Sequence, residues 1–264
     1  VARGYRAPSM AEIASNGLDP GAHIVYIGNR NFLPEFNWQS DVGFTITNRF
    51  WNVSGAVFHN SLHNFIHLTQ VTDANGQPLR DSQGNRTFQY QQASAQLYGG
   101  ELAWEYNHST GLRWSSSAAL CYGFNRREAF RGKGIMGEYL PLIPPLTVRS
   151  TVEKQFAVKG RSLQHWSLTA TAEVFGSQSR YMELYQTETP TPGYTLVSAG
   201  AGAEYKLFGQ RLQFQLQVNN LFDRVYQSNM SRLKYFEYYQ RPAGSHSGIS
   251  GMGRNIAVKI TLAF

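Results

Sequence analysis

The chain has 264 residues, carries a formal net charge of +7, and is only 16% charged but 14% aromatic. Soluble domains usually contain about 25% charged residues, so this composition favours a membrane β-barrel or a secreted β-rich protein over an ordinary soluble domain. The single cysteine excludes an intrachain disulfide framework, and the apolar runs are far shorter than the roughly 18 residues of a membrane-spanning helix.

Apolar and polar side chains alternate with a period of two along most of the chain, which predicts an all-β protein. In the clearest stretch Leu212, Phe214, Leu216 and Val218 alternate with glutamines and an asparagine. The last stretch alternates in the same way up to Phe264, and its length suits a tilted strand that crosses a bilayer. The expected strands are 1–6, 37–49, 52–69, 86–107, 111–129, 142–158, 163–178, 193–207, 211–222 and 252–264.

The connections between these strands alternate between short and long. Short turns are expected at 48–52, 107–111, 159–162 and 208–210. Long loops are expected at 7–36, 70–85, 130–141, 179–192 and 223–251. This sorting is typical of antiparallel transmembrane β-barrels, which have short periplasmic turns and long outer loops. The rival interpretations are a secreted lectin-like sandwich, which has no reason to sort its loops, and a barrel enzyme.

The chain is expected to be a piece of a longer barrel. Ten strands with two open edges cannot lie in a bilayer, because each unpaired backbone group in hydrocarbon costs several kcal/mol. The chain also begins at Val1 without a methionine or a leader sequence, as though a strand were already under way. Residues 1–264 are therefore expected to be the C-terminal portion of one β-barrel domain.

Two stretches resemble sequence motifs of the TonB-dependent outer-membrane receptors. The first is Gly4-Tyr5-Arg6-Ala7-Pro8-Ser9, with Glu12-Ile13 and Gly28-Asn29-Arg30-Asn31-Phe32-Leu33-Pro34-Glu35 after it. The second is Val218-Asn219-Asn220-Leu221-Phe222-Asp223-Arg224-Val225-Tyr226, followed by Gly253-Arg254-Asn255 and Phe264. Between them, Gly99-Gly100-Glu101-Leu102 and Pro144-Pro145-Leu146 resemble mid-barrel segments of the same family. The motifs occur in the order of the family and cover nearly the whole chain.

The resemblance implies a 22-stranded barrel of which this chain holds about the last ten strands, without the N-terminal plug. It implies active transport of a scarce nutrient across the outer membrane of a Gram-negative bacterium, most simply a ferric siderophore, with haem, zinc or cobalamin as alternatives. It implies no cofactor. The implied partners are outer-membrane lipid, a metal-chelate ligand, the TonB complex reached through the plug, and the insertion machinery that reads the C-terminal strand and Phe264.

Most motif residues also have an architectural interpretation. Pro8 disfavours helix at the residue before it, and Asn220 and Asp223 can bond to local backbone where a strand ends. Gly253 permits unusual dihedral angles at a strand entry. No G-x-S-x-G motif, no HExxH motif and no paired cysteine is present, so no catalytic residue is assigned. Nucleic acid is not expected as a partner, because no basic run or nucleic-acid module accompanies the positive charge.

His59, His63 and His67 recur every four residues within one expected strand. A regular strand would place them on one face about 13 Å apart, too far for two of them to share a metal ion. Leu62, Ile66 and Leu68 would then meet lipid, so the histidines are expected to face the lumen. They are interpreted either as a relay of weak ligand sites or as polar lumen residues.

Two basic clusters and one further histidine are the other candidates for ligand contact. Basic groups beside aromatic rings could capture an anionic ring-bearing ligand by charge and stacking, or equally the phosphates of the outer leaflet. His23 lies in the first long loop. The cluster residues are Arg126, Arg127, Arg131 and Lys133, and then Arg232, Lys234 and Tyr235 of the last loop, where Arg241 and further aromatics follow.

Overall fold

The computed structural model describes residues 1–134, 137–158, 160, 162–183, 188–207, 209–235 and 248–263, and its strands form one continuous sheet. Ten long strands lie side by side in chain order, each antiparallel to its neighbours, which confirms the ten-stranded prediction. Their bounds are β1 Ala2–Arg6, β4 Glu35–Thr47, β5 Trp51–Gln70, β6 Arg86–His108, β7 Leu112–Asn125, β8 Thr147–Ala157, β9 Leu163–Phe175, β10 Tyr194–Leu207, β11 Gln210–Asn219 and β12 Asn255–Ala263.

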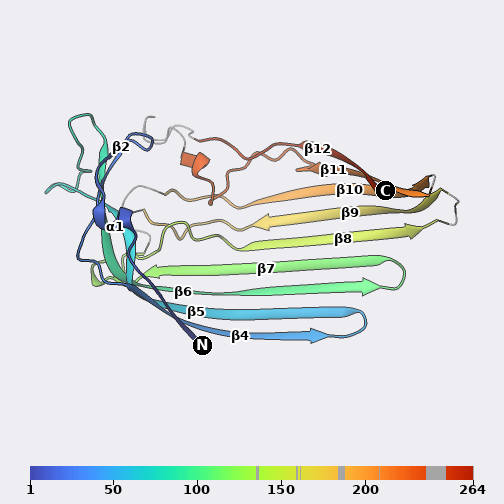
Figure 1. Cartoon of the computed structure of the whole chain (residues 1–264), viewed down its shortest axis with the longest axis horizontal. Helices are drawn as coiled ribbons and strands as arrows, with labels where there is room; N and C mark the ends of the chain where they lie inside the picture. The colour runs from blue at the N-terminus through green and yellow to red at the C-terminus, as the bar shows by residue number, and fades with distance from the viewer. Residues whose placement is uncertain are drawn as a thin grey trace.

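The short turns all lie at one end of the sheet and the long connections at the other, as Figure 1 shows. At the turn between β4 and β5 the Asn48 side chain accepts hydrogen bonds from the backbone of Phe50 and Trp51, at 2.9 and 2.8 Å. Gly111 permits the turn between β6 and β7 because its φ of +79° suits a residue without a side chain. The expected sorting of connections is therefore confirmed.

The first long connection was expected to be a loop, but it contains further structure. It holds the helix α1 (Met10–Ala14) and the strands β2 (Asn16–Asp19) and β3 (Ile24–Ile27). The helix starts because Ser9 and Glu12 form a capping box. β2 pairs with β3 in a hairpin, and β3 pairs in parallel with the outer end of β6.

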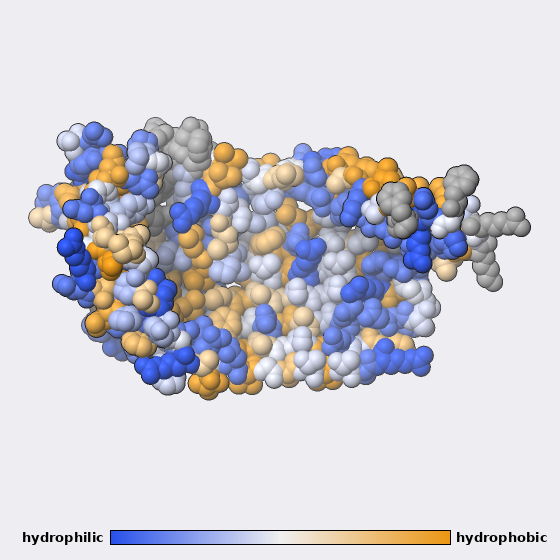
Figure 2. Space-filling view, in the orientation of Figure 1, coloured by the Kyte–Doolittle hydropathy of each residue, from blue (hydrophilic) through white to orange (hydrophobic). Residues whose placement is uncertain are grey.

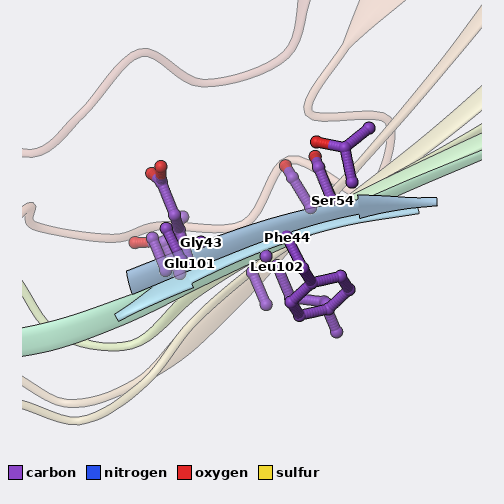
Figure 3. Close-up of a pocket in the computed structure, with 13 residues that line it drawn as sticks. Gly43, Phe44, Ser54, Glu101 and Leu102 are labelled. Carbon is purple, nitrogen blue, oxygen red and sulfur yellow. The ribbon is translucent and has the colours of Figure 1, made fainter. Parts of the chain in front are cut away.

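The sheet has one apolar and one polar face. We call the face that carries Phe44 the outward face. Phe44 lies in one row of cross-strand pairs with Leu102 and Val148, which therefore share this face. Figure 3 shows Phe44 and Leu102 on one side of the wall and Ser54 and Glu101 on the other, inner, side. Figure 2 shows a hollowed face on which hydrophilic residues gather toward the short-turn end.

The carboxylates follow this division without exception among the ten long strands. Side chains alternate between faces along a strand, and paired residues share a face. By that register, every acidic residue of these strands lies on the inner face. They are Glu35, Asp41, Glu101, Glu105, Glu153, Glu173 and Glu204. The outward face carries aliphatic and aromatic residues with few cations, as a lipid-facing surface requires.

Aromatic side chains form a belt at each end of the outward face. Near the short turns Trp104 stacks on Trp51 and meets Trp114 edge-on, with ring centroids 5.1 and 4.6 Å apart. Near the long connections Tyr98 stacks on Tyr122 at 5.5 Å. Trp114 and Tyr122 are eight residues apart on β7, so in a barrel strand tilted by about 40° the belts are roughly 21 Å apart along the barrel axis. Aromatic belts at both ends of an apolar band are typical of transmembrane β-barrels.

A sandwich would need a second sheet packed on the first, and the described strands instead all belong to one sheet. The secreted-sandwich alternative is therefore wrong for this fold. None of the described helices is long and apolar enough to cross a membrane.

Candidate functional site

A bulge in β5 separates the three histidines that the sequence places on one face. The register of β5 against β6 shifts between Leu62 and Phe65, and Asn64 takes a φ of +58°. Before the bulge His59 pairs with Tyr98 on the outward face, and His63 shares that face. After the bulge His67 pairs with Gln91 on the inner face. The prediction of three lumen-facing histidines is wrong, because one extra residue reverses the facing of every later side chain.

His67 belongs to a polar inner cluster near the long connections, together with Gln91, Asn125 and Arg127. His67 is 8% exposed and Asn125 is 1% exposed. The Arg127 guanidinium donates to the Gln91 side chain at 2.5 Å, and its backbone N–H donates to Asn125 at 3.0 Å. Within the described part of the chain, Nε2 of His67 and Nδ2 of Asn125 are buried without a hydrogen-bond partner.

Buried polar groups normally have partners, so two unpaired atoms in one cluster indicate a place where another molecule or segment bonds. The inner cluster offers a guanidinium, an amide N–H and an imidazole, which are donors suited to carboxylate, phenolate or hydroxamate oxygens. It does not offer a metal cage. No group of three or more His, Cys, Asp or Glu among the described residues is placed to hold a metal ion.

The adjacent arginines of the first basic cluster point to different partners. Arg126 donates to Gln96 at 2.8 Å and lies 5.0 Å from the Phe124 ring centroid, which places it on the outward face. Arg127 turns to the inner cluster. The other two members are exposed and make no hydrogen bond to the inner cluster within the described residues. Arg131 pairs with Glu128 at 3.8 Å, and Lys133 lies on the surface. Of this predicted basic cluster, only Arg127 belongs to the inner cluster.

The second basic cluster also separates. Lys234 lies in the 3₁₀ helix η3 (Arg232–Tyr235) and is 6% exposed. Its ammonium donates to the carbonyls of Thr189 and Pro190 and to the Thr191 hydroxyl, at 2.8, 3.0 and 2.7 Å. Burial lowers the pKa of Lys234 to about 8. Since its three donors are already used, Lys234 ties two long connections together and is not free for a ligand.

The remaining candidates of the long connections lie apart from the inner cluster. Arg232 is exposed, and the Tyr235 hydroxyl accepts from the backbone N–H of Thr189 at 3.2 Å. His23 is exposed at the turn between β2 and β3, with a φ of +54°. Arg241 and Phe264 lie outside the described residues.

Motif residues of the N-terminal stretch form a charged hub. Arg6 donates from Nε to Glu35 at 2.6 Å and through both terminal nitrogens to Glu12 at 2.9 Å. Glu35 also accepts from the backbone N–H of Ile66 at 2.5 Å. Burial raises the pKa of Glu12, but hydrogen bonds from Arg6 and Ser9 outweigh this and leave its pKa below the usual value. Pro8 immediately precedes the Ser9 cap, so the motif fixes the start of the first long connection to the wall.

Gly28, Asn29 and Leu33 complete this hub. A Cβ on Gly28 would lie 2.8 Å from the Glu12 carbonyl oxygen, so only glycine lets the chain pass against α1. The backbone N–H of Asn29 donates to the same oxygen at 2.9 Å. The backbone of Leu33 exchanges two hydrogen bonds with the Gln92 side chain, at 3.2 and 2.6 Å.

Residues of the second motif close the corner between β11 and β12. Asn220 takes a φ of +49° and bonds to both the N–H and the carbonyl of Arg224. Asp223 accepts from the backbone N–H of Arg254 at 2.7 Å, and a Cβ on Gly253 would lie 2.8 Å from the same oxygen. Leu221 and Phe222 are exposed, and the Tyr226 ring packs on Tyr194 at 4.6 Å. These contacts all run within the chain.

Four residues with notable contacts in the structure were not predicted as site residues from the sequence. Gln91 and Asn125 belong to the inner cluster; Asn125 ends β7 two residues before Arg127, whereas Gln91 lies on β6, 36 residues from Arg127, and has no sequence signal. Arg3 lies 4.8 Å from the Phe36 ring and Arg180 lies 4.2 Å from the Tyr122 ring. Both arginines are distant in sequence from the basic clusters, so no local pattern reveals them.

Comparisons with known proteins agree with this geometry. The model of the family described as TonB dependent receptor-like, beta-barrel, matches residues 1–221. A comparison with curated protein sequences found no match. Among solved structures, the copper transporter OprC superposes with a TM-score of 0.73 at 19% identity, over 98% of this chain and 35% of that one.

Two further structures show the same fold. The ferric yersiniabactin uptake receptor FyuA from Yersinia pestis has a TM-score of 0.64 at 14% identity, over 100% of this chain and 34% of that one. BauA, the ferric preacinetobactin receptor from Acinetobacter baumannii, has a TM-score of 0.61 at 14% identity, over 93% and 32%. The chain thus spans about a third of the length of the solved structures that it matches.

Proposed function

Because this chain belongs to the TonB-dependent receptor β-barrel family, we propose that it forms part of the wall of an outer-membrane receptor for a scarce nutrient, most simply a ferric siderophore. The observation that carries the proposal is the division of the sheet. Its outward face is apolar, belted by aromatic rings and free of carboxylates along the ten long strands, and its inner face is polar. Such a wall separates lipid from an aqueous interior.

The inner cluster gives the proposal its chemistry. A ferric siderophore presents anionic or polar oxygens around its metal, and Arg127, Asn125 and His67 lie together on the inner face near the long connections. Charge-assisted hydrogen bonds from a guanidinium to such oxygens are the strong ones. We therefore assign the inner cluster to the passage of the ligand from the long connections into the barrel.

Transport against a gradient needs an energy source, which the family takes from the inner-membrane TonB complex through a plug. The described elements of this chain are wall strands and their connections, so the contribution assigned to them is ligand capture and guidance. The coupling to TonB is part of the proposal for the whole receptor.

The test is uptake of radiolabelled ferric siderophores by cells that express the receptor from its own gene, with and without the proton gradient. We expect gradient-dependent uptake that falls about tenfold or more in the Arg127→Gln variant, because the loss of one charged hydrogen bond costs about 1.5–3 kcal/mol. Arg113→Gln is the matched control, since Arg113 pairs with Glu105 at 2.8 Å near the short turns.

Two outcomes would contradict the proposal. A properly inserted receptor that takes up no iron complex would refute the siderophore assignment, and haem, zinc and cobalamin would then be tested in the same cells. A protein recovered from the periplasm or the medium, and not from outer-membrane fractions, would refute the membrane location itself.

A further inference from the structure

Three arginines stack on aromatic rings at the loop end of the outward face. Arg3 lies 4.8 Å from the Phe36 ring and 5.4 Å from the Trp38 ring. Arg126 lies 5.0 Å from the Phe124 ring and Arg180 lies 4.2 Å from the Tyr122 ring. We call Arg3, Arg126, Arg180 and these rings the arginine–aromatic strip.

The strip is continuous across the wall. Arg3 pairs with Trp38, and the same row continues through Ser61 and Gln96 to Phe124. Arg3 covers rings of β4, Arg126 bonds to Gln96 of β6, and Arg180 covers a ring of β7. The rings that the arginines cover lie on β4 and β7, which are three strand spacings of about 4.8 Å apart, so the strip measured between these rings is about 14 Å wide. The exposed His59 and His63 of β5 lie on the same face between Arg3 and Arg126.

No carboxylate neutralises the strip within the part of the chain that the structure describes. The ion pairs of that part leave out Arg3, Arg126 and Arg180, and every acidic residue of the ten long strands lies on the inner face. A guanidinium over an aromatic ring can still donate N–H groups to oxygen acceptors, and Arg126 keeps its terminal nitrogens for this because only its Nε–H donates to Gln96. The charge of the strip is therefore complementary to an anion that approaches from the membrane side.

The depth of the strip identifies what that anion is attached to. The Tyr122 ring belongs to the loop-end aromatic belt, which lies at one boundary of an apolar band about 21 Å thick. Groups at that boundary meet lipid head groups. A strip about 14 Å wide with three separate guanidinium groups is suited to two phosphates on a single head group, whereas one arginine would suffice for one phosphate.

We propose that the arginine–aromatic strip binds a bisphosphorylated glycolipid of the outer leaflet, each phosphate accepting hydrogen bonds from the guanidinium groups. The inference rests on the proposed function for its location, with the long connections at the outer surface. It concerns a site on the opposite side of the wall from the inner cluster. The bound glycolipid would anchor the loop end of β4–β7 at the membrane boundary.

The test uses the receptor as made from its own gene and purified from outer membranes, with bound lipid measured by native mass spectrometry. A bisphosphorylated lipid A, its monophosphorylated form and phosphatidylglycerol are titrated separately. The variant Arg3→Gln/Arg126→Gln/Arg180→Gln is compared with Lys154→Gln. Lys154 is a matched control because it also lies on the outward face over an aromatic ring, 5.7 Å from Phe156, but at the short-turn end.

We expect the triple variant to bind bisphosphorylated lipid A about a hundredfold more weakly, since each basic residue at a membrane surface contributes about fivefold. Lys154→Gln should change the affinity less than twofold. Equal affinity in the two variants would overturn the proposal, and so would phosphatidylglycerol binding as tightly as the bisphosphorylated lipid. If the triple variant fails to insert, the three single variants replace it, with a fivefold loss expected for each.

Nutrient uptake by the same variants separates this inference from the proposed function. The triple variant should transport at the wild-type rate, because the strip does not line the interior. Wild-type protein that binds the glycolipid but transports no nutrient would refute the transport proposal and leave the lipid site standing.

Discussion

Replacing Arg6 tests whether the charged hub holds the first long connection to the wall. The Arg6→Met variant loses the 2.6 Å bond to Glu35 and the two 2.9 Å bonds to Glu12. It also leaves Glu35, whose side chain is 11% exposed, with a charge that Arg6 no longer compensates. The Arg6 side chain is 46% exposed, which screens the interaction below the 3–5 kcal/mol of a fully buried pair.

We assign about 2 kcal/mol to the Glu35 contact and about 1 kcal/mol to the more exposed Glu12 contact. The free energy of local opening should therefore fall by about 3 kcal/mol, which corresponds to roughly 150-fold faster amide hydrogen exchange. The amides to follow are those of Ile66, which donates to Glu35, and of Gly28 and Asn29, which bond near α1. Exchange is measured by mass spectrometry on the receptor in detergent micelles at pH 7.

The control is Arg113→Met, which breaks a 2.8 Å pair with Glu105 whose side chains are 56% and 31% exposed. That pair should contribute at most about 1 kcal/mol, because exposed ion pairs are weak. Peptides of β9 to β11 serve as an internal reference. Unchanged exchange at Ile66 in Arg6→Met, or equal acceleration in the control, would refute the reasoning.

The other predictions concern the same connections and use the same exchange measurement. The pKa of Glu12 in the folded chain is below its usual value, so ionised Glu12 stabilises this region above the usual pKa. That stabilisation should be lost as pH falls through the folded pKa. Amides of α1 should therefore exchange faster in acid, after correction for intrinsic exchange rates. Gly28→Ala should destabilise this region by about 1–3 kcal/mol through a 2.8 Å clash with backbone, whereas Gly4→Ala meets nothing within 4 Å and should be neutral. Lys234→Met removes the donor that serves three oxygen acceptors and should lower the opening free energy of residues 188–191 by about 2 kcal/mol, with the exposed Arg232→Met as the control.

The sequence by itself determined the strands, their order and the two faces of the wall. Alternation such as that of Leu212 to Val218 is a local property, because successive side chains of a strand must point to opposite faces. Short turns then fix each antiparallel neighbour, so the ten-stranded path follows from adjacent segments. The motifs around Arg6 and Asn220 identified the family for a similar reason, since their contacts lie at fixed positions where strands begin and end.

The candidate site was less predictable, because it depends on contacts between distant segments. The alternation of β5 gives no warning of the bulge at Asn64, yet that one residue sends His59 and His67 to opposite faces. The pairing of β3 with β6 and the burial of Lys234 beneath Thr189 and Pro190 also join segments far apart in the chain.

Tertiary structure likewise decided which basic residues act together. In the sequence Arg126 and Arg127 are neighbours and Arg3 and Arg180 are remote from both. In the fold Arg127 turns to the inner cluster, and Arg126 joins Arg3 and Arg180 on the outward face. Sequence proximity cannot reveal this grouping, because alternation separates adjacent residues by the thickness of the sheet, while cross-strand pairing brings distant residues to one surface.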